Sequence, residues 1–361
     1  MNRIIILVSL CFLFVGNVFA QSASVAAAHP LAVDVVESIL KKGGNAYDAA
    51  VAAHFSLAVV LPRAGNIGGG GFAVIHTSNA EAATLDFREI APLAASKDMF
   101  IRYENYNSSL TSKLASGVPG SVKGMWDLYI RYGSRNLSWS DLLTPAIMLA
   151  DTGFFVTKKL SEELNYNSSD FISQNPNGCG PFCKGFIWEQ GMRLVQSELA
   201  ETLKGIRDIG PNYFYYGPGA KQLVEQNYFT MLDMVSYQIR WRKPLIGEYM
   251  GWEVITMPPP SSGGVALLQL LYGSERDLNT MQELESVASY HDFTELTRIV
   301  YEDRARHLGD PDYMNTTTAD LLDTSYLYKR FANIDPKRAG KSPNLAVPLS
   351  EESSETTHFS I

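Results

Sequence analysis

The segment from Ala46 to about Val59 is rich in alanine and has almost no polar side. Such a sequence favours a helix, and a helix that is apolar nearly all round must be buried. Asn45 can cap its start, and Gly43-Gly44 ends a preceding helical pattern that follows His29-Pro30. The chain must therefore build a core that encloses this helix.

Four glycines, Gly68 to Gly71, lead into the strand-like segment Phe72 to His76, and a second such segment runs from Ala83 to Phe87. Glycines entering a strand indicate either a close approach of another group or positive φ angles. A phosphate-binding loop is disfavoured, because no GK[ST] follows and no helix begins there. Further patterns predict several helices and, in 235–255, two or three short strands, whereas 165–187 is predicted to be irregular and 335–355 a flexible tether. The additional helices are expected at 121–132, 138–150, 194–206, 219–225, 265–271 and 291–307.

Residues 1–20 have the pattern of a cleaved secretory signal: Arg3, an apolar stretch from Ile4 to Val15, and Val18-Phe19-Ala20 as the cleavage site. We therefore expect an exported protein, periplasmic or secreted. No later segment is continuously apolar over about 18 residues, so no membrane span is expected after signal removal. The net charge of −8 argues against a nucleic-acid partner.

Two of the three cysteines, Cys179 and Cys183, lie outside this leader. In an oxidising compartment such a pair favours a small-loop disulfide, and two thiols without a neighbouring histidine make a poor zinc site. The six histidines are scattered, without metal-binding spacing, and no dinucleotide-binding fingerprint occurs. We therefore predict neither a metal nor a cofactor.

Arg88, in Asp86-Phe87-Arg88-Glu89, ends the second predicted strand. One interpretation is a strand-end arginine paired with Glu89 or another surface carboxylate. The other is a bidentate clamp for a substrate carboxylate, which the planar guanidinium group suits. The residues alone leave both open.

Near the end of the sequence, an acidic, serine-rich run reaches Glu355 and is followed by Thr356. Phe359-Ser360-Ile361 then alternates like a starting strand. Thr356 could simply be a β-forming residue. Alternatively, attack of its Oγ on the carbonyl carbon of Glu355 would release Thr356 as a new N-terminus, whose own α-amine then serves as the base.

The chain resembles the γ-glutamyltranspeptidases (glutathione hydrolases) over nearly all of its length after the leader. The matching segments lie in the same order as in the family: His29–Ala32, Gly43–Ala50, Gly68–Phe72, Asp86–Pro92, Val118–Val122, Pro258–Gly264, Asp303–Arg304, Leu308–Pro311 and Thr356–Ser360. The resemblance implies an α/β (α+β) fold of the N-terminal-nucleophile hydrolase type, an αββα sandwich made from one precursor. Residues 21–355 would form the large subunit and 356–361 the start of the small subunit.

The resemblance further implies that Thr356 is the nucleophile, that Glu355-Thr356 is the self-cleaved bond, and that Arg88 holds the donor's α-carboxylate. The donor would be glutathione or another γ-glutamyl compound, and the acceptor water, an amino acid or a dipeptide. Because the family's small-subunit groups are missing, we expect an incomplete sandwich that is inactive alone. Two alternatives remain: a related acylase, of the cephalosporin or poly-γ-glutamate-processing type, and a non-catalytic truncated remnant.

Overall fold

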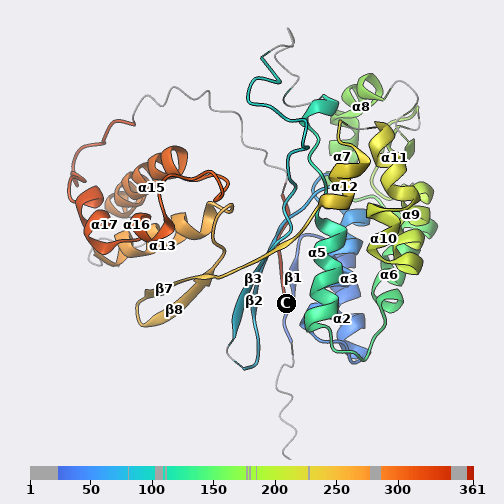
Figure 1. Cartoon of the computed structure of the whole chain (residues 1–361), viewed down its shortest axis with the longest axis horizontal. Helices are drawn as coiled ribbons and strands as arrows, with labels where there is room; N and C mark the ends of the chain where they lie inside the picture. Colours follow the sequence, from blue (N-terminus) through green and yellow to red (C-terminus); the bar gives the residue numbers. More distant parts are fainter. Residues whose placement is uncertain are drawn as a thin grey trace, which may run out of the picture.

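The computed structural model describes residues 23–79, 81–101, 109, 112–175, 178, 180–183, 185–226, 228–276, 286–342 and 356–361. The predicted signal at 1–20, Cys179, Glu355 and the part of the predicted tether after Ser342 lie outside these residues. Figure 1 shows two groups of elements. The main lobe comprises the described residues up to Arg242 together with 356–361, and the second lobe comprises those from Leu245 to Ser342.

The helix predicted from the alanine-rich segment forms the centre of the main lobe. It is α3 (Ala46–Val60), and Asn45 and Asp48 form a capping box at its start. It packs against α2 (Pro30–Lys41), α5 (Ser121–Tyr132) and α6 (Trp139–Thr152). Most of its side chains are buried, as expected for a helix that is apolar all round.

A three-stranded antiparallel sheet lies beside these helices (Figure 1). Its order is β2 (Phe72–His76), β3 (Ala82–Asp86) and β6 (Arg240–Arg242), with Phe72 opposite Asp86 and Asp86 opposite Arg240. A separate ribbon joins β1 (Ala26–Ala27) to β9 (Phe359–Ser360). The strand predicted at Phe359 is thus confirmed, and the described C-terminal residues lie beside the N-terminal strand.

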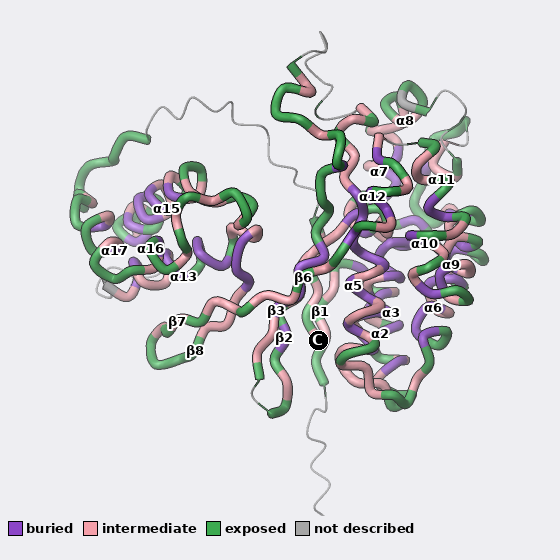
Figure 2. Tube along the Cα trace, in the orientation of Figure 1, coloured by how far each residue is buried: buried purple, intermediate pink, exposed green. Residues whose placement is uncertain are grey.

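The second lobe has a smaller core of its own. The helices α13 (Gly263–Arg276), α15 (Val287–His307), α16 (Thr318–Leu321) and α17 (Thr324–Phe331) accompany a hairpin of β7 (Leu245–Tyr249) and β8 (Trp252–Thr256). Leu296, Val300, Leu327 and Phe331 form its buried cluster. Figure 2 shows this buried interior as separate from that of the main lobe.

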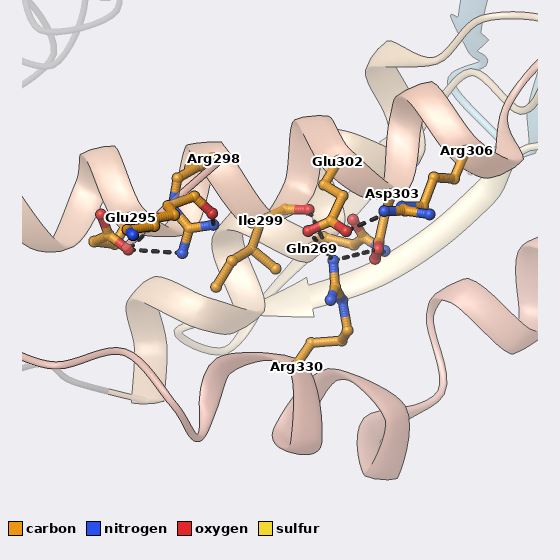
Figure 3. A network of polar contacts seen from close by, with 9 residues as sticks. Gln269, Glu295, Arg298, Ile299, Glu302, Asp303, Arg306 and Arg330 are labelled. Carbon is orange, nitrogen blue, oxygen red and sulfur yellow. Dashed lines mark hydrogen bonds and ion pairs between the residues drawn. The ribbon is translucent and has the colours of Figure 1, made fainter. Parts of the chain in front are cut away.

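Charged groups hold the helices of the second lobe together (Figure 3). Arg330 of α17 forms ion pairs with Asp303 (2.8 Å) and Glu302 (3.2 Å) of α15. Gln269 of α13 donates to Asp303 (3.3 Å). Because Asp303 is almost fully buried, this network fixes the C-terminal half of α15 against its neighbours.

The remaining elements depart from the sequence-based expectations in several places. The 165–187 segment, predicted to be irregular, contains α8, and the region around 231 forms the short helix α12, which Thr230 and Asp233 cap. The helices α7, α10, α16 and α17 and the short strands β4 and β5 were not predicted either. Propensity reasoning missed these helices because each is too short to show a clear period. The other bounds are β4 (Phe154–Phe155), α7 (Lys158–Tyr166), α8 (Ser168–Gln174), β5 (Arg193–Leu194), α9 (Ser197–Ile209), α10 (Pro211–Tyr215), α11 (Pro218–Gln226) and α12 (Met231–Ser236), with 3₁₀ turns at Lys113–Ala115 and Gly180–Phe182.

The beginning of the predicted tether is anchored rather than free. The N–H of Gly340 donates to Glu295 (3.0 Å), and Arg298 donates to the carbonyl of Lys341 (3.2 Å). His291 contacts the carbonyl of Asp335 at 2.8 Å. For residues 335–342 the expectation of a flexible tether is therefore wrong, because α15 supplies partners for its backbone.

Candidate active site

The glycine run places Arg88 by allowing a close approach. A Cβ at Gly70 would lie 2.4 Å from the carbonyl oxygen of Phe87 and 2.8 Å from the Cα of Arg88, and a Cβ at Gly120 would lie 1.9 Å from the same oxygen. None of the four glycines at 68–71 has a positive φ. Of the two explanations that the sequence allows, close approach is therefore the correct one.

Hydrogen bonds then fix the backbone of Arg88 on both sides. Its N–H donates to Asp86 Oδ1 (3.1 Å), and its carbonyl accepts from the hydroxyl of Tyr237 (2.8 Å). Asp86 is itself held by Arg242, with Nε 2.8 Å from Oδ2. Burial raises the pKa of Tyr237, so its hydroxyl stays protonated and can donate.

Tyr237 belongs to a buried aromatic stack. Its ring lies parallel to that of Tyr215, with centroids 5.8 Å apart, and the Tyr215 hydroxyl donates to the carbonyl of Pro119 (2.8 Å). Lys123 lies over the Tyr215 ring and donates its Nζ to the carbonyl of Tyr237. Both tyrosines are almost completely buried, so the support beneath Arg88 is rigid.

The side chain of Arg88 is exposed, and its guanidinium lies over the ring of Phe72, 5.9 Å from the centroid. Within the described ranges it forms no ion pair with Glu89 or any other carboxylate. The interpretation that Arg88 pairs with a surface carboxylate is therefore wrong for the described residues. The guanidinium instead lines a cavity of about 340 Å³ that lies between the two lobes.

A second cavity of about 330 Å³ shares Arg88, Pro260 and Gly309 with the first. Its lining carries both signs of charge, and one of its arginines, Arg240, pairs with Asp312 (3.1 Å) across the lobes. Asp310 Oδ1 accepts from the N–H of Asp312 (3.0 Å), a contact typical of turns. Arg88 therefore lines both cavities, which together we call the cleft.

Thr356 is exposed, at the start of the segment that leads into β9. It is not among the described residues that line either cavity, so the structure does not bring it together with Arg88 there. The Oγ1 of the next residue, Thr357, is buried without a hydrogen-bond partner in the part of the chain that the structure describes. Glu355 lies outside that part.

Cys183 is disulfide-bonded, and Cys179, its predicted partner, lies outside the described residues. Across those residues no group of three or more His, Cys, Asp or Glu side chains could hold a metal ion. Among the helices described, none is both long and apolar enough to span a membrane.

Sequence reasoning did not assign roles to three groups of this site. Arg304 and Ser262 line the first cavity, and Tyr237 fixes the backbone of Arg88. Ser262 directly precedes α13, and its carbonyl accepts from the N–H of Ala266 (3.1 Å). Only the Asp303-Arg304 pair, noted as a family motif, could have drawn attention to Arg304.

Comparison with known proteins agrees with this architecture. The chain is 41% identical over 352 residues to the glutathione hydrolase proenzyme of Pseudomonas aeruginosa, and the alignment covers 94% of this chain but only 61% of that protein. The crystal structure of Helicobacter pylori γ-glutamyltranspeptidase superposes with a TM-score of 0.84 at 38% identity, covering 89% of this chain and 95% of the crystallised one. A cephalosporin acylase from Bacillus halodurans superposes with a TM-score of 0.80 at 26% identity, covering 86% of this chain and 59% of that one.

The chain thus spans about three fifths of the length of the curated relative. Its mixed helix and sheet structure is that of an N-terminal-nucleophile hydrolase of the α+β class, as the sequence resemblance implied. The γ-glutamyltranspeptidase family model matches residues 32–361, a range that contains the glycine run, Arg88 and the whole cleft, and the chain therefore belongs to the γ-glutamyltranspeptidase family.

Proposed function

We propose that this chain supplies the donor-binding half of an enzyme that transfers or hydrolyses γ-glutamyl groups, with glutathione or a similar compound as donor. The observation that carries the proposal is Arg88. A rigidly held backbone presents its guanidinium to a cleft, and no described carboxylate neutralises it. Such a group suits the α-carboxylate that every γ-glutamyl donor carries.

In this proposal Thr356 becomes the nucleophile by self-cleavage. Its Oγ attacks the carbonyl carbon of Glu355, the acyl group moves from nitrogen to oxygen, and water hydrolyses the ester. Glu355 then ends in a carboxylate and Thr356 begins with a free amine, which can accept the hydroxyl proton at neutral pH. The threonine next takes the γ-glutamyl group, and water or an amine acceptor releases it.

The extents of the matches support a second chain as partner. This chain covers 61% of a curated proenzyme but 95% of a crystallised γ-glutamyltranspeptidase chain. We infer that the remaining part of the proenzyme supplies the groups that stabilise the oxyanion, and that the present segment alone is inactive. Removing even one oxyanion donor typically costs about 10²–10³ in kcat. Export through the predicted leader is part of the same proposal.

The test is steady-state hydrolysis of γ-glutamyl-p-nitroanilide by the full-length precursor and its Arg88→Ala variant. Losing a charge-assisted hydrogen-bond pair is expected to raise KM about 10- to 100-fold. Arg207→Ala is the matched control, because Arg207 pairs with Asp208 on the surface of α9, away from the cleft. An unchanged KM in Arg88→Ala would refute the assignment of the clamp.

The same preparation distinguishes a γ-glutamyl enzyme from a related acylase, an alternative that the structural similarity to a cephalosporin acylase supports. An acylase would hydrolyse butyryl-p-nitroanilide, which has neither the α-amine nor the α-carboxylate, as well as the γ-glutamyl compound, and Arg88→Ala would leave that activity unchanged. A γ-glutamyl enzyme should discriminate strongly against the butyryl compound.

A further inference from the structure

The side chain of Arg88 makes one polar or aromatic contact within the described residues, with the ring of Phe72. Its guanidinium carbon lies over that ring, 5.9 Å from the centroid. Across the described ranges the guanidinium forms neither a hydrogen bond nor an ion pair, although the backbone N–H and carbonyl of Arg88 are both held. The position of the guanidinium in the cleft therefore depends on this ring.

The pairing of β2 with β3 explains why the two side chains meet. Phe72, the first residue of β2, lies opposite Asp86, and backbone hydrogen bonds continue the pairing for one residue beyond β3. Side chains alternate along a strand, so Arg88, two residues after Asp86, shares a face with Phe72. A Cβ at Gly70 would lie 2.8 Å from the Cα of Arg88, so the glycine leaves the arginine side chain room to reach the ring.

An aromatic ring suits the support of a guanidinium that has to bind a carboxylate. The ring attracts the cation through its π face and uses none of the five N–H donors of the arginine. Both side chains line the same cavity of about 340 Å³. An arginine that is ordered before its ligand arrives loses less side-chain freedom on binding, so it binds the ligand more tightly.

We propose that Phe72 is a positioning residue of the carboxylate clamp, whose ring holds the guanidinium of Arg88 ready for the α-carboxylate of the donor. The proposal rests on the proposed function, because it takes that carboxylate to be the ligand of Arg88. The ring acts through Arg88 and not on the reacting bond. Its contribution is therefore expected in KM and not in kcat, and it should be the same for γ-glutamyl donors with different leaving groups.

The first test measures hydrolysis of two donors by the full-length precursor and its Phe72→Leu variant: γ-glutamyl-p-nitroanilide, which has an aromatic leaving group, and γ-glutamylglycine, which has none. Leucine stays apolar but has no π face, so KM should rise about 3- to 10-fold for both donors, with kcat within about twofold. Phe72→Tyr, which keeps the ring, should recover most of the affinity. An unchanged KM for both donors, or a rise for the anilide alone, would overturn the proposal, because in the second case the ring would bind the leaving group.

A double-mutant cycle shows whether the ring acts through Arg88. In the Arg88→Ala background there is no guanidinium to hold, so the addition of Phe72→Leu should change KM by less than about twofold. An equal rise of KM in both backgrounds would refute a positioning role. Val74→Ala is the control and should have the wild-type KM, because Val74 is a half-exposed residue of the same strand that lines neither cavity.

The strength of the ring contact can also be varied with little change of shape. Fluorine atoms withdraw electron density from the face of the ring, so 3,4,5-trifluorophenylalanine at position 72 should raise KM about 2- to 5-fold, while the unfolding free energy stays close to that of the wild type. This variant provides the decision if Phe72→Leu unfolds too readily to be assayed. An unchanged KM in the fluorinated protein would overturn the proposal.

Failure of the proposed function would be visible separately, as a wild-type precursor that releases a γ-glutamyl group from neither donor. Phenylglyoxal reacts with accessible guanidinium groups, and peptide mass spectrometry gives its rate at Arg88 without any turnover. Loss of the ring should make Arg88 react about 2- to 5-fold faster in Phe72→Leu than in wild type, with the rate at Arg207 on α9 unchanged. Equal rates at Arg88 in the two proteins would refute the ring contact, whatever the donor assays show.

Discussion

Tyr237→Phe removes one hydroxyl beneath Arg88 and keeps the ring. That hydroxyl donates to the carbonyl of Arg88 at 2.8 Å, and the side chain is 1% exposed. The phenylalanine ring can retain the stack on Tyr215. Loss of one such hydrogen bond costs about 1 kcal/mol of unfolding free energy. Since Arg88 keeps only its bond to Asp86, we also expect KM for a γ-glutamyl donor to rise about 3- to 10-fold, with kcat nearly unchanged.

The matched control is Tyr215→Phe in the same stack. Tyr215 is equally buried and donates to the carbonyl of Pro119 at the same distance of 2.8 Å, but it does not touch Arg88. Both variants should lose similar stability in urea unfolding, and only Tyr237→Phe should change KM. If both variants raised KM alike, or if neither did, the claim that Tyr237 positions Arg88 would be wrong.

Three further predictions concern the packing of the site and the second lobe. Gly70→Ala should destabilise the precursor by more than about 2 kcal/mol, because its Cβ would overlap the backbone of Phe87 and Arg88. In the control Gly68→Ala the new Cβ meets nothing within 4 Å, so this variant should unfold at the wild-type urea concentration. Equal losses of unfolding free energy in the two variants would exclude the close approach as the cause. Arg330→Met leaves Asp303 buried without its ion pair and should lower the unfolding free energy by about 3 kcal/mol. Arg306→Met, on the more exposed side of Glu302, should lower it by under about 1 kcal/mol. Equal decreases in melting temperature would show that the buried network does not stabilise the second lobe. The hydrogen bond from Arg298 lowers the pKa of Glu295, and ion pairs with Arg330 and Arg306 lower the pKa of Glu302 although burial raises it. The stabilisation by these ion pairs is therefore present above about pH 4.3 and is lost as pH falls through the folded-state pKa values of the two glutamates. Amide hydrogen exchange in α15 should accelerate below that pH. An exchange rate that does not depend on pH, after correction for the intrinsic rate, would refute this prediction.

The fold was predictable where local sequence and burial agree. The buried helix α3, the strands β2 and β3 and the terminal strand β9 all appear close to their predicted positions, because alanine content, capping and alternation act over a few residues. The short helix α12 and the anchored segment 335–342 were not predictable. Both depend on partners far away in the chain, such as Asp233 accepting from the N–H of Leu93 and Glu295 accepting from Gly340.

In the candidate site, too, local features were predictable from the sequence and long-range contacts were not. Arg88 could be singled out because it ends a strand in a recognisable motif. Its support by Tyr237, about 150 residues later, and the position of Arg304 opposite it depend on how the lobes fold together. A single sequence carries no signal for such long-range pairs, beyond the motifs that contain them.

The central claim is that Thr356 becomes an N-terminal nucleophile and receives a γ-glutamyl group from a donor held by Arg88. Intact-mass spectrometry of the full-length precursor, acid-quenched during turnover of a γ-glutamyl donor, tests it most directly. The account predicts two polypeptides, of which the second begins at Thr356 and carries a γ-glutamyl adduct on that residue. An uncleaved precursor that turns over the donor, or an adduct on any other residue, would contradict it.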